Sequence, residues 1–187
     1  MNMNLDTLLQ SRPAPFTVRP YALADKPQVR SLYLSAYPSA RRSDLVDLDA
    51  MLIGDHPGYV VFESSKGIIA CGISSPEFQN KSVWLWAHAI LPSEASDDLH
   101  SDLTNVLIGV LPEDEAPYCA RVEGIKDRND FFENLGFEMA CPVMGNCSID
   151  HEIQVFERDV SAADILSIRD KYQRQGISIP RHLFLHG

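Results

Sequence analysis

The segment from Asp127 to Ala140, DRNDFFENLGFEMA, constrains the fold of this chain more than any other. Polar residues that can cap a helix precede two adjacent aromatic residues, and Gly136 follows where a glycine can take the left-handed conformation that ends a helix. The pattern predicts a strand directly afterwards, from Phe137. The side chains that this junction can bury together are Phe131, Phe132, Leu135 and Phe137. The segment therefore predicts a short helix joined to a strand by a tight corner.

The composition is that of one globular domain. The chain has 187 residues, of which 45% are hydrophobic and 22% are charged. Its net charge of -10 and pI near 4.9 oppose binding to nucleic acid or to an anionic membrane surface, because long-range repulsion acts against both. The same charge favours a cationic or amine substrate.

The sequence gives no sign of membrane insertion or secretion. No apolar run approaches the roughly 20 residues that a membrane span needs. The N-terminus, MNMNLDTLLQSRPAP, lacks the basic start and apolar core of a signal peptide. We therefore expect a cytoplasmic protein.

The four cysteines do not form a disulfide framework in a chain of this length. Cys71 and Cys119 lie in strand-like runs and are interpreted as small buried hydrophobic residues. Cys141, Cys147 and His151 match no common zinc spacing, and a fourth ligand is not evident. We expect no metal site.

Hydrophobic periodicity and turn residues predict a succession of helices and strands. In chain order the expected elements are a strand (16–19), helices after Asp25 and Ser43, strands at 59–63, 68–73 and 83–91, a helix after Ser96, a strand at 118–123, the corner helix, and strands at 138–143 and 148–156. The strand at 83–91 has two apolar faces and should be central, covered on both sides. One face is expected to carry Trp84, Trp86, His88 and Ile90, and the other Leu85, Ala87, Ala89 and Leu91.

A C-terminal helix is predicted from Ser161 to about Gln175. Asp164 completes a capping box with Ser161, and Gly176 ends the helix. Its apolar stripe consists of Ile165, Ile168 and Tyr172. Such a stripe must be covered, either by its own domain or by a second subunit, and we favour a homodimer formed through this extension.

The order of elements, together with the corner's helix, aromatic pair, Glu, two residues, Gly and Phe, resembles the GNAT superfamily of N-acetyltransferases over residues 16–158. The resemblance implies an α/β (α+β) fold with a mixed, mostly antiparallel central sheet and helices on both faces. A leader (1–15) precedes this domain and a helical extension (159–187) follows it. The resemblance also implies a sheet that splays between the strands at 83–91 and 118–123, with acyl-CoA in the splay.

The resemblance places CoA contacts on the first of these strands, on the following loop and helix start, and on the corner helix. The implied residues are Ala89, Ile90, Ala95, Ser96, Asp97, Asp98, Leu99, His100, Asn129 and Phe132. Family members hold the CoA pyrophosphate with backbone N–H groups of a glycine-containing motif at a helix N-terminus. That motif falls here on Ala95, Asp98 and His100, none of which matches it. The loop instead carries Glu94, Asp97 and Asp98, whose carboxylates would repel a diphosphate.

The candidates for acid and base chemistry are few. Many family members use a Tyr to protonate the departing thiolate, but the aligned residue here is Phe132, which has no proton to give. His88 is the first candidate for a general base, because its unperturbed pKa is near the working pH. Glu123, on the facing strand, is the second. For His88 itself, however, the preferred interpretation is a core residue packed between Trp86 and Ile90.

Two functions follow from this reading. The resemblance implies an N-acyltransferase that moves an acyl group from acetyl-CoA to the primary amine of a small molecule or peptide. The alternative is a catalytically inactive GNAT-fold module for binding or dimerisation that has lost the CoA phosphate loop. We expect the transferase.

Overall fold

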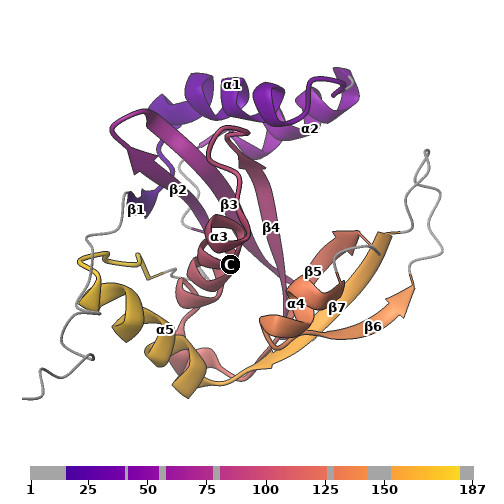
Figure 1. Cartoon of the computed structure of the whole chain (residues 1–187), viewed down its shortest axis with the longest axis vertical. Helices are drawn as coiled ribbons and strands as arrows, with labels where there is room; N and C mark the ends of the chain where they lie inside the picture. The colour runs from indigo at the N-terminus through magenta and orange to yellow at the C-terminus, as the bar shows by residue number, and fades with distance from the viewer. Residues whose placement is uncertain are drawn as a thin grey trace, which may run out of the picture.

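The computed structural model describes residues 16–40, 42–54, 58–77, 81–125, 129–142 and 153–181 (Figure 1). The strands in these ranges are β1 (Thr17–Pro20), β2 (Tyr59–Ser64), β3 (Gly67–Glu77), β4 (Ser82–Ile90), β5 (Tyr118–Ile125), β6 (Glu138–Pro142) and β7 (Ile153–Val160). The helices are α1 (Lys26–Ala36), α2 (Arg42–Met51), α3 (Asp97–Gly109), α4 (Asn129–Asn134) and α5 (Ala162–Arg174), with short 3-10 helices η2 (Leu23–Asp25) and η3 (Glu113–Glu115). None of these helices has the length and hydrophobicity that a membrane span requires.

The described strands form one mixed sheet in the order β1-β2-β3-β4-β5-β7-β6. Every neighbouring pair is antiparallel except β4 and β5, which are parallel. This parallel pair is in register only where Ser82, Val83 and Trp84 lie opposite Cys119, Ala120 and Arg121. Beyond these residues the two strands separate, and in Figure 1 the β5-β7-β6 half of the sheet turns away from β4. The predicted sheet type and its splay are both confirmed.

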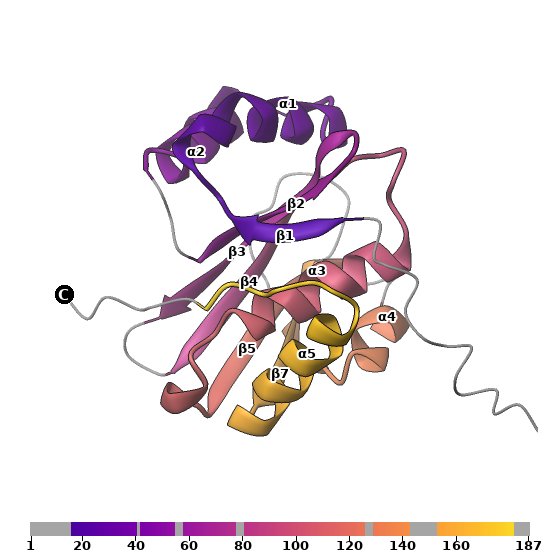
Figure 2. The same cartoon turned by 90° about the vertical axis from the view of Figure 1, so that its left-hand side faces the viewer.

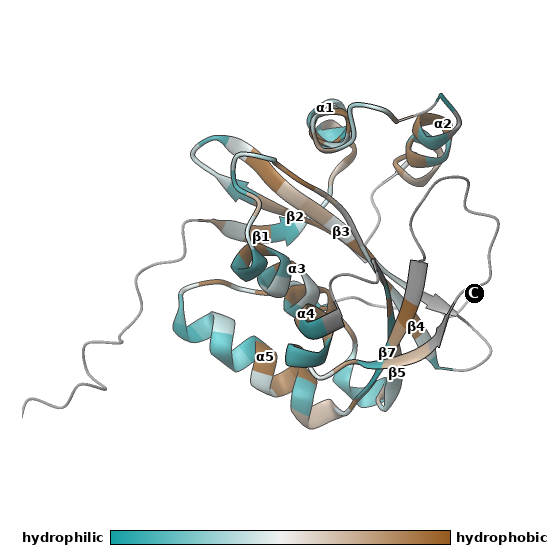
Figure 3. Cartoon of the chain, turned by 45° about the vertical axis from the view of Figure 1, so that its right-hand side comes forward, coloured by the Kyte–Doolittle hydropathy of each residue, from teal (hydrophilic) through white to brown (hydrophobic). Residues whose placement is uncertain are grey.

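Two apolar cores lie on opposite faces of the sheet. Helices α1 and α2 cover one face, whereas α3, α4 and α5 lie on the other (Figure 3). The core beneath α1 and α2 includes Val29, Leu32, Leu48, Leu52, Tyr59, Val61, Cys71 and Ile73. The larger core, beneath α3 and α5, includes Phe62, Leu85, Leu103, Leu107, Val122, Phe156, Val160 and Ile165. Burial on both faces makes β3 and β4 the centre of the fold.

The predicted division of β4 into two faces is wrong at its C-terminal end. Ile90 lies in the α3 core with Val83 and Leu85, not on the side of Trp86. The cause is a β-bulge, because Cys71 pairs with Ala89 and Gly72 pairs with Ala87, so that His88 is an extra residue on β4. An extra residue reverses the alternation of every side chain that follows it.

The corner at the end of α4 forms as the sequence predicts. Gly136 has a φ of +79°, and the Phe137 N–H bonds to the Phe132 carbonyl at 3.0 Å. The Phe132 ring stacks on Phe156 with centroids 4.9 Å apart. Strand β6 begins at Glu138, the predicted start of the strand at 138–143, and Phe137 is the last residue of the corner.

The last strand lies further along the chain than predicted. It spans Ile153–Val160 rather than 148–156, and Ser148 is outside the described residues. Its charged residues do not end it, because Glu157 and Asp159 point to the face opposite the buried Phe156 and Val160. For the same reason Cys119, predicted to be buried, is only half-buried, since it pairs with Asp159 on that face.

Helix α5 packs against its own domain. Its capping box, formed by Ser161 and Asp164, is present as predicted, and Ile165 and Tyr172 are completely buried. Figure 2 shows α5 beside α3, and the Tyr172 hydroxyl donates to Asp102 Oδ1 on α3 at 2.5 Å. The apolar stripe is therefore covered within one chain, so it does not itself require the predicted dimer.

Candidate functional site

The separation of β4 from β5 leaves a stretch of β4 with one paired edge. From Leu85 to Ile90 this strand pairs with β3, whereas its register with β5 ends at Trp84. Backbone N–H and C=O groups along such an edge can pair with an extended ligand. Ala89 and Ile90 have buried side chains, so only their backbones can contribute as the predicted CoA contacts.

The bulge places an irregular backbone within this edge. His88 is the extra residue there, but its side chain is outside the described part of the structure. Its assignment as a general base therefore stays a prediction. The same holds for Asn129, which begins α4 but whose side chain is likewise not described.

The N-terminus of α3 follows the end of β4 after a tight turn. The Glu94 N–H bonds to the Leu91 carbonyl at 2.8 Å, and the Ser96 hydroxyl caps α3 by accepting from the Leu99 N–H at 3.2 Å. The Glu94 carboxylate forms an ion pair with Lys66 in the β2–β3 turn, so its charge is partly neutralised.

Two carboxylates remain exposed at the start of α3. Asp97 and Asp98 follow the exposed Ala95 and Ser96, and no glycine separates them from the end of β4. Acidic residues there stabilise the helix through its dipole, but they also reduce the attraction of the helix end for phosphate. The segment predicted to bind pyrophosphate thus does form the start of a helix, but its carboxylates oppose the binding of an anion.

Aromatic rings connect α3 with α4. The His100 ring lies edge-on to Phe131 with centroids 6.1 Å apart, and Phe131 lies edge-on to Phe132 at 5.1 Å. Phe132 itself packs between Phe156 and Phe137. The structure therefore brings His100 and the corner helix together, while the half-buried Phe132 packs against the core and offers no proton.

Glu123 lies on β5 just beyond the segment that pairs with β4. Its side chain is exposed on the side opposite the buried Val122. Neighbouring atoms still displace part of its solvent, which raises the pKa of the Glu123 carboxyl above its ordinary value. A carboxylate with a raised pKa is better suited to accept a proton near neutral pH.

A polar row on the same face was not anticipated from the sequence. The Arg121 guanidinium carbon lies 6.0 Å from the centre of the Trp84 ring, and Arg121 Nε donates to Glu157 Oε1 at 2.7 Å. Trp84 also stacks on Trp86 with ring centroids 5.2 Å apart. The alternation of Cys119, Arg121 and Glu123 with apolar residues along β5 is the signal that could have identified this row.

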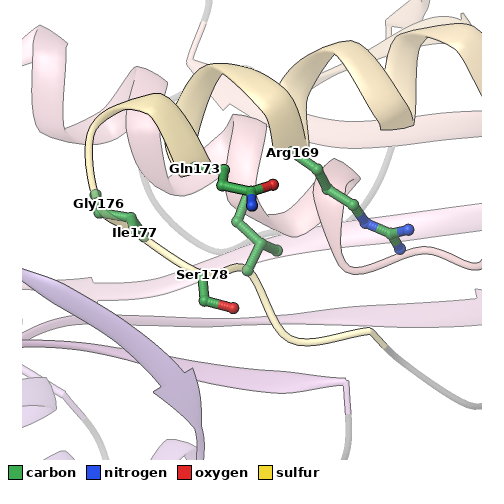
Figure 4. Close-up of a pocket in the computed structure, with 6 residues that line it drawn as sticks. Arg169, Gln173, Gly176, Ile177 and Ser178 are labelled. Carbon is green, nitrogen blue, oxygen red and sulfur yellow. The ribbon is translucent and has the colours of Figure 1, made fainter.

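Two cavities lined by described residues lie away from the splay. One, of about 640 Å³, is on the outer side of η2 and α1 and is lined by Leu23, Lys26, Pro27, Arg30, Ser31 and Leu34. The other, of about 350 Å³, lies between α5 and the chain that follows it (Figure 4). Its lining includes Arg169, Gln173, Gly176, Ile177 and Ser178. Neither contains a predicted site residue.

Comparisons with known proteins give matches in structure but not in sequence. No protein-family model and no curated protein matches this chain. Ard1 from Thermoplasma volcanium superposes with a TM-score of 0.61 at 14% identity, covering 79% of this chain and 99% of that protein.

Two further solved structures are equally similar. The ribosomal-protein-S18-alanine N-acetyltransferase from Escherichia coli has a TM-score of 0.61 at 15% identity and covers 78% and 94% of the two chains. The polyamine N-acetyltransferase of Drosophila melanogaster has a TM-score of 0.60 at 12% identity and covers 78% and 100%. The chain therefore has the fold of the GNAT superfamily of N-acetyltransferases.

Proposed function

We propose that this chain is an N-acyltransferase that transfers the acetyl group of acetyl-CoA to a primary amine. The observation that carries the proposal is the separation of β4 from β5 after only three register pairs. This separation leaves the β4 backbone from Leu85 to Ile90 available to pair with the pantetheine arm, beside the N-terminus of α3. When bound, acetyl-CoA supplies the thioester whose carbonyl carbon the amine attacks.

The chain's own groups would act mainly by positioning and polarisation. Backbone N–H groups along the open edge of β4 can donate to the thioester carbonyl oxygen as negative charge develops on it. The cationic amine first loses one proton to solvent, and Glu123 can then accept the second proton, which the nitrogen loses as it bonds to the carbonyl carbon and the C–S bond breaks. Solvent must then protonate the thiolate, because Phe132 cannot. Most of the rate enhancement would come from holding the two reactants together.

The proposed acceptor is a cationic amine of a small molecule or peptide. A chain with a net charge of -10 attracts such amines and repels anionic ones. The similar structures include enzymes named for an alanine of ribosomal protein S18 and for polyamines. Free amino groups of this kind carry positive charge at neutral pH.

The second candidate is a GNAT-fold module without catalysis. It is favoured by the glycine-free segment from Ala95 to Asp98, by the exposed carboxylates of Asp97 and Asp98, and by Phe132, which packs against the core and has no proton to give. In this candidate the architecture is retained for binding or for dimerisation.

Acetyl-CoA binding and turnover separate the two candidates. At about 100 times its Kd, a ligand stabilises a protein by about 2.7 kcal/mol, so acetyl-CoA should clearly raise the melting temperature. Release of CoA thiol is then measured with spermidine, agmatine and a peptide with an N-terminal alanine. Stabilisation together with amine-dependent thiol release supports the transferase. Stabilisation without release supports a binding module, and no stabilisation contradicts the transferase.

A further inference from the structure

We propose that Tyr59, Cys71 and Gly72 are positioning residues that fix the bulge of β4 at His88. Tyr59 is on β2, and the other two are adjacent on β3, directly opposite the bulge. The consequence for catalysis rests on the proposed function, because the bulge lies in the backbone edge that would face the thioester. The structural part of the proposal does not depend on it.

Gly72 allows β4 to approach β3 more closely than any other residue would permit. A Cβ atom at this position would lie 2.6 Å from the Trp86 carbonyl oxygen and 3.1 Å from Leu107 Cδ1. The first of these atoms belongs to the backbone of β4, so it cannot move aside as a flexible side chain would. Gly72 pairs with Ala87, the residue just before the bulge. A glycine here therefore permits the close approach of the strands at this point.

Cys71 lies on β3 opposite the residue that follows the bulge. It pairs with Ala89, the residue just after His88, and both Cys71 and Tyr59 are completely buried. The Tyr59 hydroxyl donates to Cys71 Sγ at 3.3 Å. This hydrogen bond fixes two buried side chains directly behind the bulge, where the strand ladder is locally disrupted.

The chemistry of Cys71 fits a hydrogen-bond acceptor and not a nucleophile. Burial raises the pKa of the Cys71 thiol to about 11, so the thiol stays neutral at physiological pH. A neutral sulfur in this position can accept from the Tyr59 hydroxyl. The thiol and the hydroxyl thus form a buried support directly behind the open edge of β4.

The position of the bulge determines which side chains of β4 enter each of the two cores and which of its backbone N–H groups lie along the open edge. With the extra residue at 88, Ala89 enters the α1–α2 core and Ile90 enters the α3 core. If the bulge moved by one residue along β4, the side chain between its old and new positions would point to the opposite face of the sheet. A different backbone N–H group would then lie along the open edge of β4. Fixing the bulge therefore fixes which backbone groups are available to polarise an acyl carbonyl.

The structural test is amide hydrogen exchange of Ala89, measured by NMR on the full-length protein without ligand. Cys71→Ala removes the sulfur that packs behind the bulge and accepts from Tyr59, and it should speed exchange at Ala89 by about tenfold relative to the amides of β2. Cys71→Ser keeps an acceptor for Tyr59 and should stay closer to the unmodified protein. Cys119→Ala is the matched control, because Cys119 lies on β5 away from the bulge. Unchanged exchange at Ala89 in Cys71→Ala would overturn the proposal.

Tyr59→Phe tests the hydroxyl with the same measurement. Its control is Tyr21→Phe, since Tyr21 is buried beside Tyr59, with ring centroids 5.1 Å apart, while its hydroxyl donates to the Leu52 carbonyl. Tyr59→Phe should speed exchange at Ala89 and Tyr21→Phe should not. Equal effects of the two variants would contradict a specific role for the Tyr59 hydroxyl. Gly72→Ala is not used, because the displaced backbone can prevent folding.

The kinetic test uses acetyl-CoA with whichever of spermidine, agmatine or the alanine peptide the unmodified protein acetylates. Cys71→Ala should lower kcat by about 10- to 100-fold while the KM for acetyl-CoA changes by less than about threefold, and Cys71→Ser should restore most of the loss. Equal losses of kcat in Cys71→Ala and Cys119→Ala would overturn the positioning role. A protein that acetylates none of the amines contradicts the proposed function, and amide exchange then decides the structural proposal alone.

Discussion

At the scale of single residues, Arg169 on α5 links the C-terminal extension to the domain through three hydrogen bonds. Its Nε donates to the Gly109 carbonyl at 2.7 Å, and Nη2 donates to the Leu111 carbonyl at 2.8 Å. Its Nη1 donates to Glu113 Oε2 at 2.6 Å. One planar guanidinium thus satisfies carbonyls at the end of α3, where positive charge also complements the helix dipole.

Replacing Arg169 should therefore be costly. Arg169→Ala leaves buried carbonyls without a donor and should lower the free energy of unfolding by about 2 to 4 kcal/mol. Arg174→Ala is the matched control on the same helix, because Arg174 is exposed and should cost less than about 0.5 kcal/mol. Chemical denaturation measures both, and similar losses in the two variants would contradict the assigned role.

Asp102 gives a second prediction at this scale, about pH. Burial raises the pKa of its carboxyl, although the hydrogen bond from Tyr172 acts in the opposite direction. A carboxyl with a raised pKa in the folded state favours the native state at low pH, and this contribution is lost as pH rises through the folded pKa. Asp102→Asn removes the titration but keeps an acceptor for the Tyr172 hydroxyl.

The stability of Asp102→Asn relative to the unmodified protein should consequently increase between pH 4 and pH 7. Urea denaturation at several pH values provides the measurement, with Asp170→Asn as a control for the loss of one surface charge on α5. A stability difference that stays constant over this range would show that Asp102 titrates alike in the folded and unfolded states.

At the scale of elements, the features that could be predicted from sequence are those set by local chemistry. The Ser96 cap, the Ser161 capping box and the left-handed Gly136 depend on residues only a few positions away, and all three are present. The bulge at His88 and the extent of β7 depend on residues in other strands. The periodicity of one segment cannot reveal that a strand contains an extra residue relative to its neighbour. Nor can it reveal that the charged residues of a strand point to the face of the sheet opposite the core.

The same limit applies to the candidate site. The resemblance located the open edge of β4 and the start of α3, because both follow from the order of elements. It did not reveal that Lys66 neutralises Glu94, since that contact joins residues 28 positions apart. Nor did it reveal the Arg121–Glu157 pair, which depends on the register of β5 with β7.

A prediction for α3 follows from the two carboxylates that remain at its start. Asp97→Asn/Asp98→Asn should strengthen CoA binding several-fold, because each close charge pair opposes a diphosphate by on the order of 1 kcal/mol in water. The gain should shrink at high salt, where exposed charges are screened. Calorimetric titration with CoA at two salt concentrations measures both effects, with Asp170→Asn as the control. Unchanged affinity would show that charge at the helix start is not the obstacle.

At the scale of the whole molecule, the structure assigns the C-terminal extension to the core of its own domain. Ile165 and Tyr172 are completely buried, and Ile177 is 3% exposed in the segment after α5. Gly109 on α3 lies directly under this segment, because a Cβ there would be 2.9 Å from Ile179 Cδ1. The extension therefore packs beside α3 and belongs to the core on this face of the sheet.

Truncation after Val160, where β7 ends, should thus destabilise the domain. Each large apolar side chain that loses its burial costs roughly 1.5 to 3 kcal/mol, so losing three of them amounts to several kcal/mol, and the apolar surface of α3 becomes exposed. Denaturation and light scattering on the full-length and truncated chains measure stability and mass together. If the extension instead joins two subunits, truncation converts a dimer into a monomer that is still stable. Because Arg169 and Tyr172 form hydrogen bonds to α3 within one chain, we expect truncation to lower the stability without changing the number of subunits. A dimeric full-length protein that becomes a stable monomer on truncation would contradict this expectation.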